Sequence, residues 1–405
     1  MNISERVNNM QASPIRRLIP YAEKAKKRGI KVLHLNIGQP DIKTPQIYFD
    51  YIKNYSHNID SYSHSAGIVE LREKFCEFYN YYDVNLSSDE IVITQGGSEA
   101  IIMSLSVIAD PGDEVLVVEP FYANYKGFAG MVNVNLVPVS TTPEAGYKMP
   151  EIIDFENKIT EKTRAILFSN PCNPTGAVYS KNEIERILKL AKKYNLWIIC
   201  DEVYREFVFD NLEPFSILSF GDYSDRIIMI DSISKRYSAC GARVGLLATK
   251  NKDFHREVIK IAQARLSPST LPQIGTIGLL SLGREYINNI KKEYQYRRDI
   301  VYEELNKVDG LYFKKPKGAF YVSVLLPVDD SEKFVKWLLT DFNVNGYTTM
   351  VAPLSGFYVA KDSGKREVRV AYVLDDEKIK LASSILAKGL IEYDKLTKEE
   401  KLINV

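Results

Sequence analysis

The chain has 405 residues, 45% of them hydrophobic and 26% charged, which is typical of a globular protein with a large core. Its 53 basic and 52 acidic residues nearly cancel, so we expect neither nucleic acid nor an anionic membrane as a partner. The start of the chain lacks the apolar core of a signal peptide, no apolar run reaches transmembrane length, and no cysteines or histidines are spaced as metal ligands. We therefore expect a cytoplasmic protein with reduced thiols and no metal site.

The middle of the chain predicts strands that alternate with helices. An N-terminal helix is indicated by Ile15, Leu18, Ile19, Ala22 and Ala25 at helical spacing. Because several later runs are apolar at nearly every position, we expect strands that are buried on both faces. The alternation predicts a mostly parallel, seven-stranded α/β sheet. Its strands are Ile91–Thr94, Val115–Glu119, Val132–Val137, Ala165–Ser169, Leu196–Asp201, Ile227–Asp231 and Val244–Ala248.

Beyond about residue 280 the pattern changes to a smaller α+β arrangement. The predicted elements are a charged helix from Arg284 to about Asp309, a strand around Phe320–Leu325, a helix near Ser331–Asp341, a strand near Val368–Val373 and a terminal helix. We expect a large domain over residues 45–280. The smaller domain would combine residues 1–44 with residues 281–405.

Polar motifs follow the predicted strands at the edge where ligands bind in open α/β sheets. Gly96-Gly97-Ser98 opens a helix whose N-terminus suits a phosphate, although a simple turn has the same pattern. The loop Asn170–Gly176 contains two Asn-Pro steps and also reads as a structural turn. Each motif alone is therefore ambiguous.

Three charged residues extend this set. Asp201 follows an apolar strand and should be partly buried, which requires a partner unless the carboxylate only caps a helix. Lys235 follows the next strand and is a candidate nucleophilic amine, against the usual alternative of a solvated lysine. Arg243, eight residues later, could clamp a phosphate.

In their order and spacing these motifs resemble the aspartate-aminotransferase superfamily of fold-type I pyridoxal-phosphate enzymes. The resemblance runs from Asn36-Ile37-Gly38-Gln39-Pro40-Asp41 to Arg369-Val370-Ala371-Tyr372. It implies the catalytic residues: Lys235 holds the cofactor as a Schiff base and carries the proton, Asp201 pairs with the pyridinium nitrogen, and Tyr204 contacts the phenolic oxygen.

The same resemblance implies the remaining site residues. Asn173 joins Tyr204 at the phenolic oxygen, Tyr122 stacks on the ring, and the phosphate is held by Gly97, Ser98, Glu99, Ser232, Ser234 and Arg243. Tyr62 resembles a tyrosine that reaches the phosphate from a partner subunit, which implies a homodimer with shared active sites. Arg369 resembles the arginine that grips the substrate α-carboxylate, with Gly38 and Asn173 beside it.

Some relatives have a cationic side chain that binds a second carboxylate of the substrate, and this chain has no cation at either of the sequence positions where they have it. Here Ser98 stands where one group has lysine, and Gln263 where another group has a partner-subunit arginine. Arg265 is expected to replace it, because residues two apart in an extended loop point the same way. Arg16 and Arg17 are further candidates, for which surface charge on an amphipathic helix is the favoured interpretation.

The sequence therefore predicts a pyridoxal-phosphate-dependent aminotransferase that uses aspartate and a 2-oxo acid such as 2-oxoglutarate in a ping-pong reaction. Aromatic amino acids, alanine or a specialised donor remain alternatives, as does a β-lyase on the same scaffold. A serine acyl enzyme using Ser232-Ile233-Ser234-Lys235 lacks its partner motifs. A non-catalytic scaffold would not require Lys235, Asp201 and Arg369 together.

Overall fold

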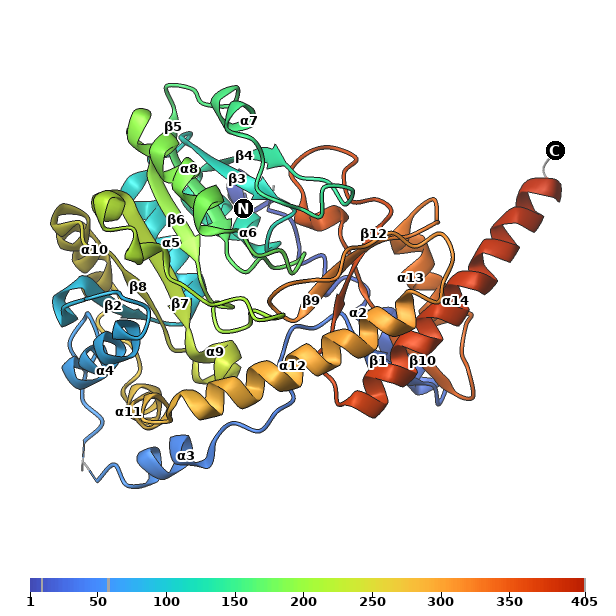
Figure 1. The fold of residues 1–405 in the computed structure, drawn as a ribbon, viewed down its shortest axis with the longest axis horizontal. Helices are drawn as coiled ribbons and strands as arrows, with labels where there is room; N and C mark the ends of the chain where they lie inside the picture. The colour runs from blue at the N-terminus through green and yellow to red at the C-terminus, as the bar shows by residue number, and fades with distance from the viewer. Residues whose placement is uncertain (9, 57–58, 404–405) are drawn as a thin grey trace.

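The computed structural model describes residues 1–8, 10–56 and 59–403, with side chains to residue 396. A seven-stranded sheet lies at the centre of the larger of the two parts of the molecule (Figure 1). Its strands lie in the order β2-β8-β7-β6-β5-β3-β4, and all neighbours are parallel except the pairs made by β8. The strands are β2 Ile91–Thr94, β3 Glu114–Glu119, β4 Asn135–Ser140, β5 Thr163–Ser169, β6 Trp197–Asp201, β7 Ile227–Ser232 and β8 Gly245–Ala248.

Seven predicted strands are thus confirmed, with one displaced. The run predicted at Val132–Val137 begins as a strand only at Asn135. Val132 still belongs to helix α6, Asn124–Val132, and the chain then turns through Asn133 in the left-handed region, at φ 58°. Asparagine tolerates this backbone conformation, so the turn falls inside a run that alternates valine with asparagine like a strand, and the strand boundary is hidden.

Helices cover both faces of the sheet because its strands bury alternate residues on opposite sides. Ile198 and Cys200 face one hydrophobic core, and Ile199 faces the other. The helices at the N-terminus and around the sheet are α1 Glu5–Asn8, α2 Ile19–Lys27, α3 Gln46–Lys53, α4 Val69–Asn80, α5 Gly97–Ile108, α6 Asn124–Val132, α7 Ile152–Glu156, α8 Lys181–Lys193, α9 Ile233–Arg236, α10 Lys252–Ala264 and α11 Thr270–Leu280. A capping box of Ser180 and Glu183 starts α8. We call the sheet with α3 to α11 the sheet body.

A second assembly, the small body, carries its own hydrophobic core beside the sheet body (Figure 1). It contains α2, α12 Arg284–Leu305, α13 Ser331–Thr340 and α14 Asp376–Ile403, with β1 Lys31–His34 paired to β10 Tyr347–Met350. A three-stranded antiparallel sheet joins β9 Tyr321–Leu325, β11 Ala352–Pro353 and β12 Glu367–Ala371. Leu18 and Ala22 lie in this core, so the N-terminal helix packs here as expected. The predicted domain boundaries stay a prediction.

Among the described residues, none of the helices is both long and apolar enough to cross a membrane. Within the same part of the chain, no group of histidine, cysteine, aspartate or glutamate side chains is arranged to hold a metal ion.

Candidate functional site

A cavity of about 570 Å³ lies where the carboxyl ends of the sheet-body strands meet the small body and the N-terminal arm. It gathers twelve of the fifteen predicted site residues: Gly38, Gly97, Ser98, Tyr122, Asn173, Asp201, Tyr204, Ser232, Ser234, Lys235, Arg243 and Arg369. The register of the sheet explains this convergence, because Ser169 at the end of β5 pairs with Asp201 at the end of β6, and Asp201 pairs with Ile230 in β7. Three predicted residues, Glu99, Tyr62 and Arg265, do not line the cavity.

The first turn of α5 and Arg243 form a cradle at one end of the cavity. Arg243 has a left-handed backbone at φ 53°, and its Nη2 donates to the carbonyl of Gln95 at 3.0 Å. A Cβ on Gly96 would lie 2.4 Å from that nitrogen, so only glycine allows the guanidinium to approach. Ser232 and Ser234 line the same cavity with their hydroxyl oxygens 2.8 Å apart. Free helix N–H groups, a guanidinium and hydroxyls together suit an anion such as phosphate.

The Asp201 carboxylate lies buried on the cavity wall. Tyr125 donates to its Oδ2 at 2.7 Å, and the backbone N–H of Val203 donates to its Oδ1 at 3.1 Å. Burial raises the pKa of Asp201 above its ordinary value, while the bond from Tyr125 opposes that shift. A cation in the cavity would relieve the cost of burying this charge.

Lys235 projects from the short helix α9, immediately after β7. Its Nζ donates to the carbonyl of Gly38 at 2.9 Å and lies 3.7 Å from the sulfur of Cys240. Ser232 caps the helix by accepting a hydrogen bond from the Ser234 N–H. The amine is thereby held inside the cavity rather than in bulk solvent.

Arg369, in β12, contributes a buried guanidinium to the cavity lining. It donates to Asn173 Oδ1 at 2.9 Å and to the carbonyl of Asn36 at 2.7 Å, while its Nε has no hydrogen-bond partner. The side chain is only 1% exposed. A buried donor without a partner carries a free-energy penalty, which an incoming carboxylate would relieve.

Two tyrosines at this site were not predicted from the sequence. Tyr125 holds Asp201, as described above. The Tyr321 hydroxyl lies 2.7 Å from that of Tyr204, and the Tyr321 ring centroid lies 4.4 Å from Cζ of Arg369. Gly38 must be glycine because its Cβ would collide with the Tyr321 hydroxyl. Only the position of Tyr125 one helical turn beyond Tyr122 offered a signal, whereas Tyr321 reads in sequence as an ordinary core residue of β9.

The three predicted residues outside the cavity have other contacts in the single chain. Tyr62 is exposed, and the Glu99 carboxylate accepts from Arg265 Nη1 at 2.6 Å. Arg265 also donates to the carbonyls of Ser65 and Ile93. The expected extended loop is instead helical: Gln263 lies in α10 and Arg265 is its C-cap. Residues two apart on a helix diverge, so the expectation that Arg265 replaces a cation at Gln263 for that reason is wrong.

The structure also separates Arg16 from Arg17. Arg17 forms a surface ion pair with Glu332 and donates to Ser355 Oγ at 3.2 Å. Arg16 lines the cavity together with Ser13, Ile15 and Ile19 of the N-terminal arm. The surface interpretation therefore holds for Arg17, and it is incomplete for Arg16.

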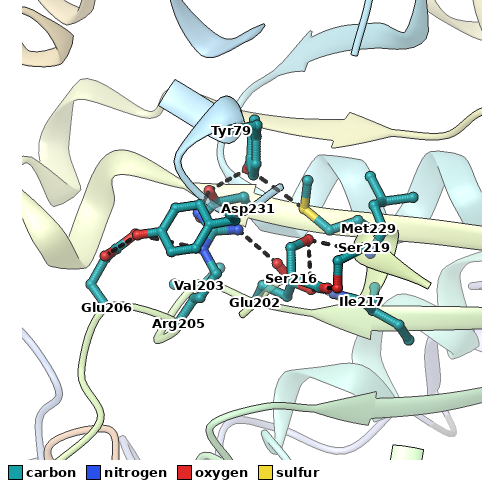
Figure 2. Close-up of polar contacts among 12 residues, drawn as sticks. Tyr79, Glu202, Val203, Arg205, Glu206, Ser216, Ile217, Ser219, Met229 and Asp231 are labelled. Carbon is teal, nitrogen blue, oxygen red and sulfur yellow. Dashed lines mark hydrogen bonds and ion pairs between the residues drawn. The ribbon is translucent and has the colours of Figure 1, made fainter. Parts of the chain in front are cut away.

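A buried ionic cluster links the loop after β6 to the end of β7 and to α9 (Figure 2). Arg205 donates to Glu202 Oε2 at 2.7 Å and to Asp231 Oδ2 at 3.0 Å. Arg236, next to Lys235, bonds to the same Asp231 oxygen and to Glu206. Burial pushes the pKa of Asp231 upward, but Arg236 and Arg205 outweigh it and hold that pKa below its ordinary value. Two arginines thus face three buried carboxylates, and Arg284 Nη1 supplies a third positive charge 3.2 Å from Glu206 Oε2. The cluster braces the segments that carry Asp201 and Lys235.

Residues 30–386 of the chain match the aminotransferase class I and II family. The chain is 31% identical over 368 residues to the aspartate aminotransferase of Sulfolobus acidocaldarius, covering 88% of this chain and 89% of that protein. It is 30% identical over 412 residues to aromatic-amino-acid aminotransferase 2 of Thermococcus litoralis, covering all of both. The solved structure of an alanine aminotransferase from Pyrococcus furiosus superposes with a TM-score of 0.88 at 31% identity, covering 96% of this chain and 100% of that one.

Proposed function

Because the chain belongs to the class I and II aminotransferases, whose members use pyridoxal phosphate, we propose that it transfers the amino group of an L-amino acid, with aspartate favoured, to a 2-oxo acid such as 2-oxoglutarate. The reaction would run in two half-reactions of a ping-pong cycle. The observation that supports this most directly is one cavity that brings together Lys235, Asp201, Arg243 and Arg369.

The residues of the cavity fit pyridoxal phosphate. The cradle of Arg243, Ser232, Ser234 and the first turn of α5 suits the phosphate, and its glycine leaves no space for a Cβ. Asp201 is a buried carboxylate that calls for a cationic partner, which the protonated ring nitrogen would provide. The cofactor supplies an aldehyde that the Lys235 amine can bond and a ring that takes up electrons from the substrate's α-carbon.

The chain's own residues would position the substrate and move the proton. Arg369 holds the α-carboxylate, with Asn173 fixing the orientation of its guanidinium. The Lys235 amine, held beside the Gly38 carbonyl, takes the proton from the substrate's α-carbon. Tyr204 contacts the phenolic oxygen, and Tyr122 packs on the ring; both line the cavity.

A homodimer with shared sites completes the proposal. Tyr62 is 80% exposed in the single chain, and Ile59, Leu266 and Leu271 are partly exposed. These residues lie in two segments joined by hydrogen bonds from Ser63 to Pro268 and from Thr270 to Ser61. A second copy would cover this apolar surface and bring its Tyr62 to the phosphate. The proposal places the enzyme in the cytoplasm.

A half-reaction screen tests the function. Single amino acids are added to the cofactor-loaded protein, and loss of the yellow colour is ranked by rate. Aspartate should rank first, and borohydride should attach the cofactor to Lys235. Lys235→Ala should lower turnover by at least about 10²–10⁴-fold, the range of a general acid–base group.

The same screen separates the alternatives. A β-lyase would release pyruvate and ammonia from a β-substituted amino acid without consuming a 2-oxo acid. A colourless protein that does not take up pyridoxal phosphate would refute the proposal, as would near-normal turnover by Lys235→Ala.

A further inference from the structure

The charges that line the cavity exceed what the cofactor needs. The described lining contains four cationic side chains, Arg16, Lys235, Arg243 and Arg369, but only one carboxylate, Asp201. Such a positive cavity attracts anions. Its charges can be assigned one by one to the cofactor and to the substrate.

The proposed cofactor accounts for three of these five groups. Arg243 would bind its phosphate, Lys235 would bond to its aldehyde carbon, and Asp201 would pair with its ring nitrogen. Two guanidinium groups, on Arg369 and Arg16, then remain to face the substrate. An amino acid with a single carboxylate would satisfy only one of them.

We propose that Arg16 binds the distal carboxylate of a dicarboxylic amino acid while Arg369 binds its α-carboxylate, an inference that rests on the proposed function. Arg16 makes no hydrogen bond or ion pair with its side chain within the described part of the chain. The other cations near this site are already engaged: Arg265 with Glu99 and backbone carbonyls, and Arg17 with Glu332. Among the four cationic side chains of the described lining, Arg16 is thus the one that has neither a hydrogen-bond partner nor an ion pair.

The arm that carries Arg16 is packed against the small body, so the backbone of Arg16 is held beside the cavity. Pro14 is buried, and a Cβ on Gly356 would lie 2.3 Å from the Pro14 Cβ, which shows how closely the two segments pack. Ile15 packs against the buried cluster of Ala123, Leu354, Phe357 and Tyr358. An arginine on a packed arm binds a carboxylate better than an arginine on a flexible chain end, because less conformational entropy is lost on binding.

The test compares Arg16→Gln with Arg17→Gln, its neighbour of equal charge on the same arm. Each variant is loaded with cofactor and assayed with aspartate and with alanine, and its affinity for maleate, a dicarboxylate, is measured by calorimetry. A charge-assisted hydrogen bond contributes enough that Arg16→Gln should weaken maleate binding and lower kcat/KM for aspartate by about 10- to 100-fold. Its kcat/KM for alanine should change by less than about 3-fold, and Arg17→Gln should resemble the wild type with all three compounds.

Two further measurements make the outcome decisive. Arg16→Lys should recover part of the maleate affinity, since it keeps the charge but loses the bidentate geometry. Because Arg16 is exposed, raising the salt concentration should weaken maleate binding to the wild type more than to Arg16→Gln. Equal losses on aspartate and alanine, or unchanged maleate affinity in Arg16→Gln, would overturn the assignment of Arg16. A protein that no amino acid bleaches would instead refute the proposed function.

Discussion

Tyr321 is the residue whose contacts change the chemistry expected of its neighbours. Its hydroxyl shares a hydrogen bond with that of Tyr204, and burial raises the pKa of Tyr204 well above its ordinary value. If Tyr204 donates its single proton to the cofactor's phenolic oxygen, then Tyr321 must be the donor between the two tyrosines. A chain of two donors strengthens the bond to an anionic oxygen.

In Tyr321→Phe the hydrogen bond to the anionic phenolic oxygen should be weaker, so that oxygen should favour a proton on the Schiff-base nitrogen beside it more strongly. The pH at which the cofactor's visible colour change is half complete should therefore rise, by up to about one unit. The estimate follows from a hydrogen bond of about 0.5–1.5 kcal/mol and about 1.4 kcal/mol per pKa unit. Absorbance titration measures it. Tyr294→Phe is the control, because Tyr294 is equally buried and its hydroxyl has no partner. An unchanged midpoint in Tyr321→Phe would contradict the expected order of donors.

Tyr125→Phe should raise the pH at which the protein releases its cofactor on acidification. The bond from Tyr125 opposes the rise that burial causes in the pKa of Asp201, so its loss raises that pKa further. The carboxylate that pairs with the ring nitrogen is present above this pKa and disappears as the pH falls through it. The variant should then release cofactor at a higher pH than the wild type, as measured by equilibrium dialysis across a pH series; coincident release curves would show that Tyr125 has no such role.

Among the elements, α9 and the ends of β6 and β7 depend on the buried ionic cluster. Asp231 has a folded-state pKa below its unfolded value of about 3.9. It therefore stabilises the fold above that value and loses the contribution as the pH falls through the folded pKa. Arg236→Met leaves Asp231 and Glu206 with fewer partners, so unfolding should require about 3–5 kcal/mol less free energy, and acid unfolding should begin at a higher pH.

Chemical denaturation and acid titration followed by circular dichroism measure both effects. Arg186→Met is the matched control, since it breaks the exposed pair with Glu151 and should change stability by about 0–1 kcal/mol. Equal losses in the two variants would mean that the buried cluster contributes no more than a surface pair.

The elements and the site residues differ in how far the sequence predicts them. Strands buried on both faces are apolar throughout, so β2 to β8 were predictable to within a few residues except where Asn133 turns the chain. Asp201 ends such a strand, Lys235 follows one and Arg243 precedes one, which makes them predictable as well. The positions of Arg16, Arg265 and Tyr321 were not, because each depends on packing between segments far apart in sequence.

For the whole molecule, the shared site predicts that two defective chains repair each other. Mixing Lys235→Ala with Tyr62→Ala should form hybrid dimers with one site in which both Lys235 and the partner's Tyr62 are intact. Random exchange would restore roughly a quarter of all sites to the wild-type state. Turnover at limiting cofactor measures the recovery, and the unmixed variants are the controls. Mixtures no more active than their average would indicate that each chain builds its site alone.

The long helix α12 joins the two bodies as one uninterrupted rod (Figure 1). It begins at Arg284, which bonds to Tyr82 and Glu206 of the sheet body, and it ends at Leu305 in the core of the small body. Its 22 residues span about 33 Å, so a tilt of about 5° at Arg284 would displace the other end by about 3 Å. Arg369 and the arm of Arg16 both travel with the small body, whereas Lys235 and Asp201 stay with the sheet. The small body would then bind both carboxylates of a dicarboxylate, and a tilt of α12 would move the bound substrate toward the Lys235 amine of the sheet body.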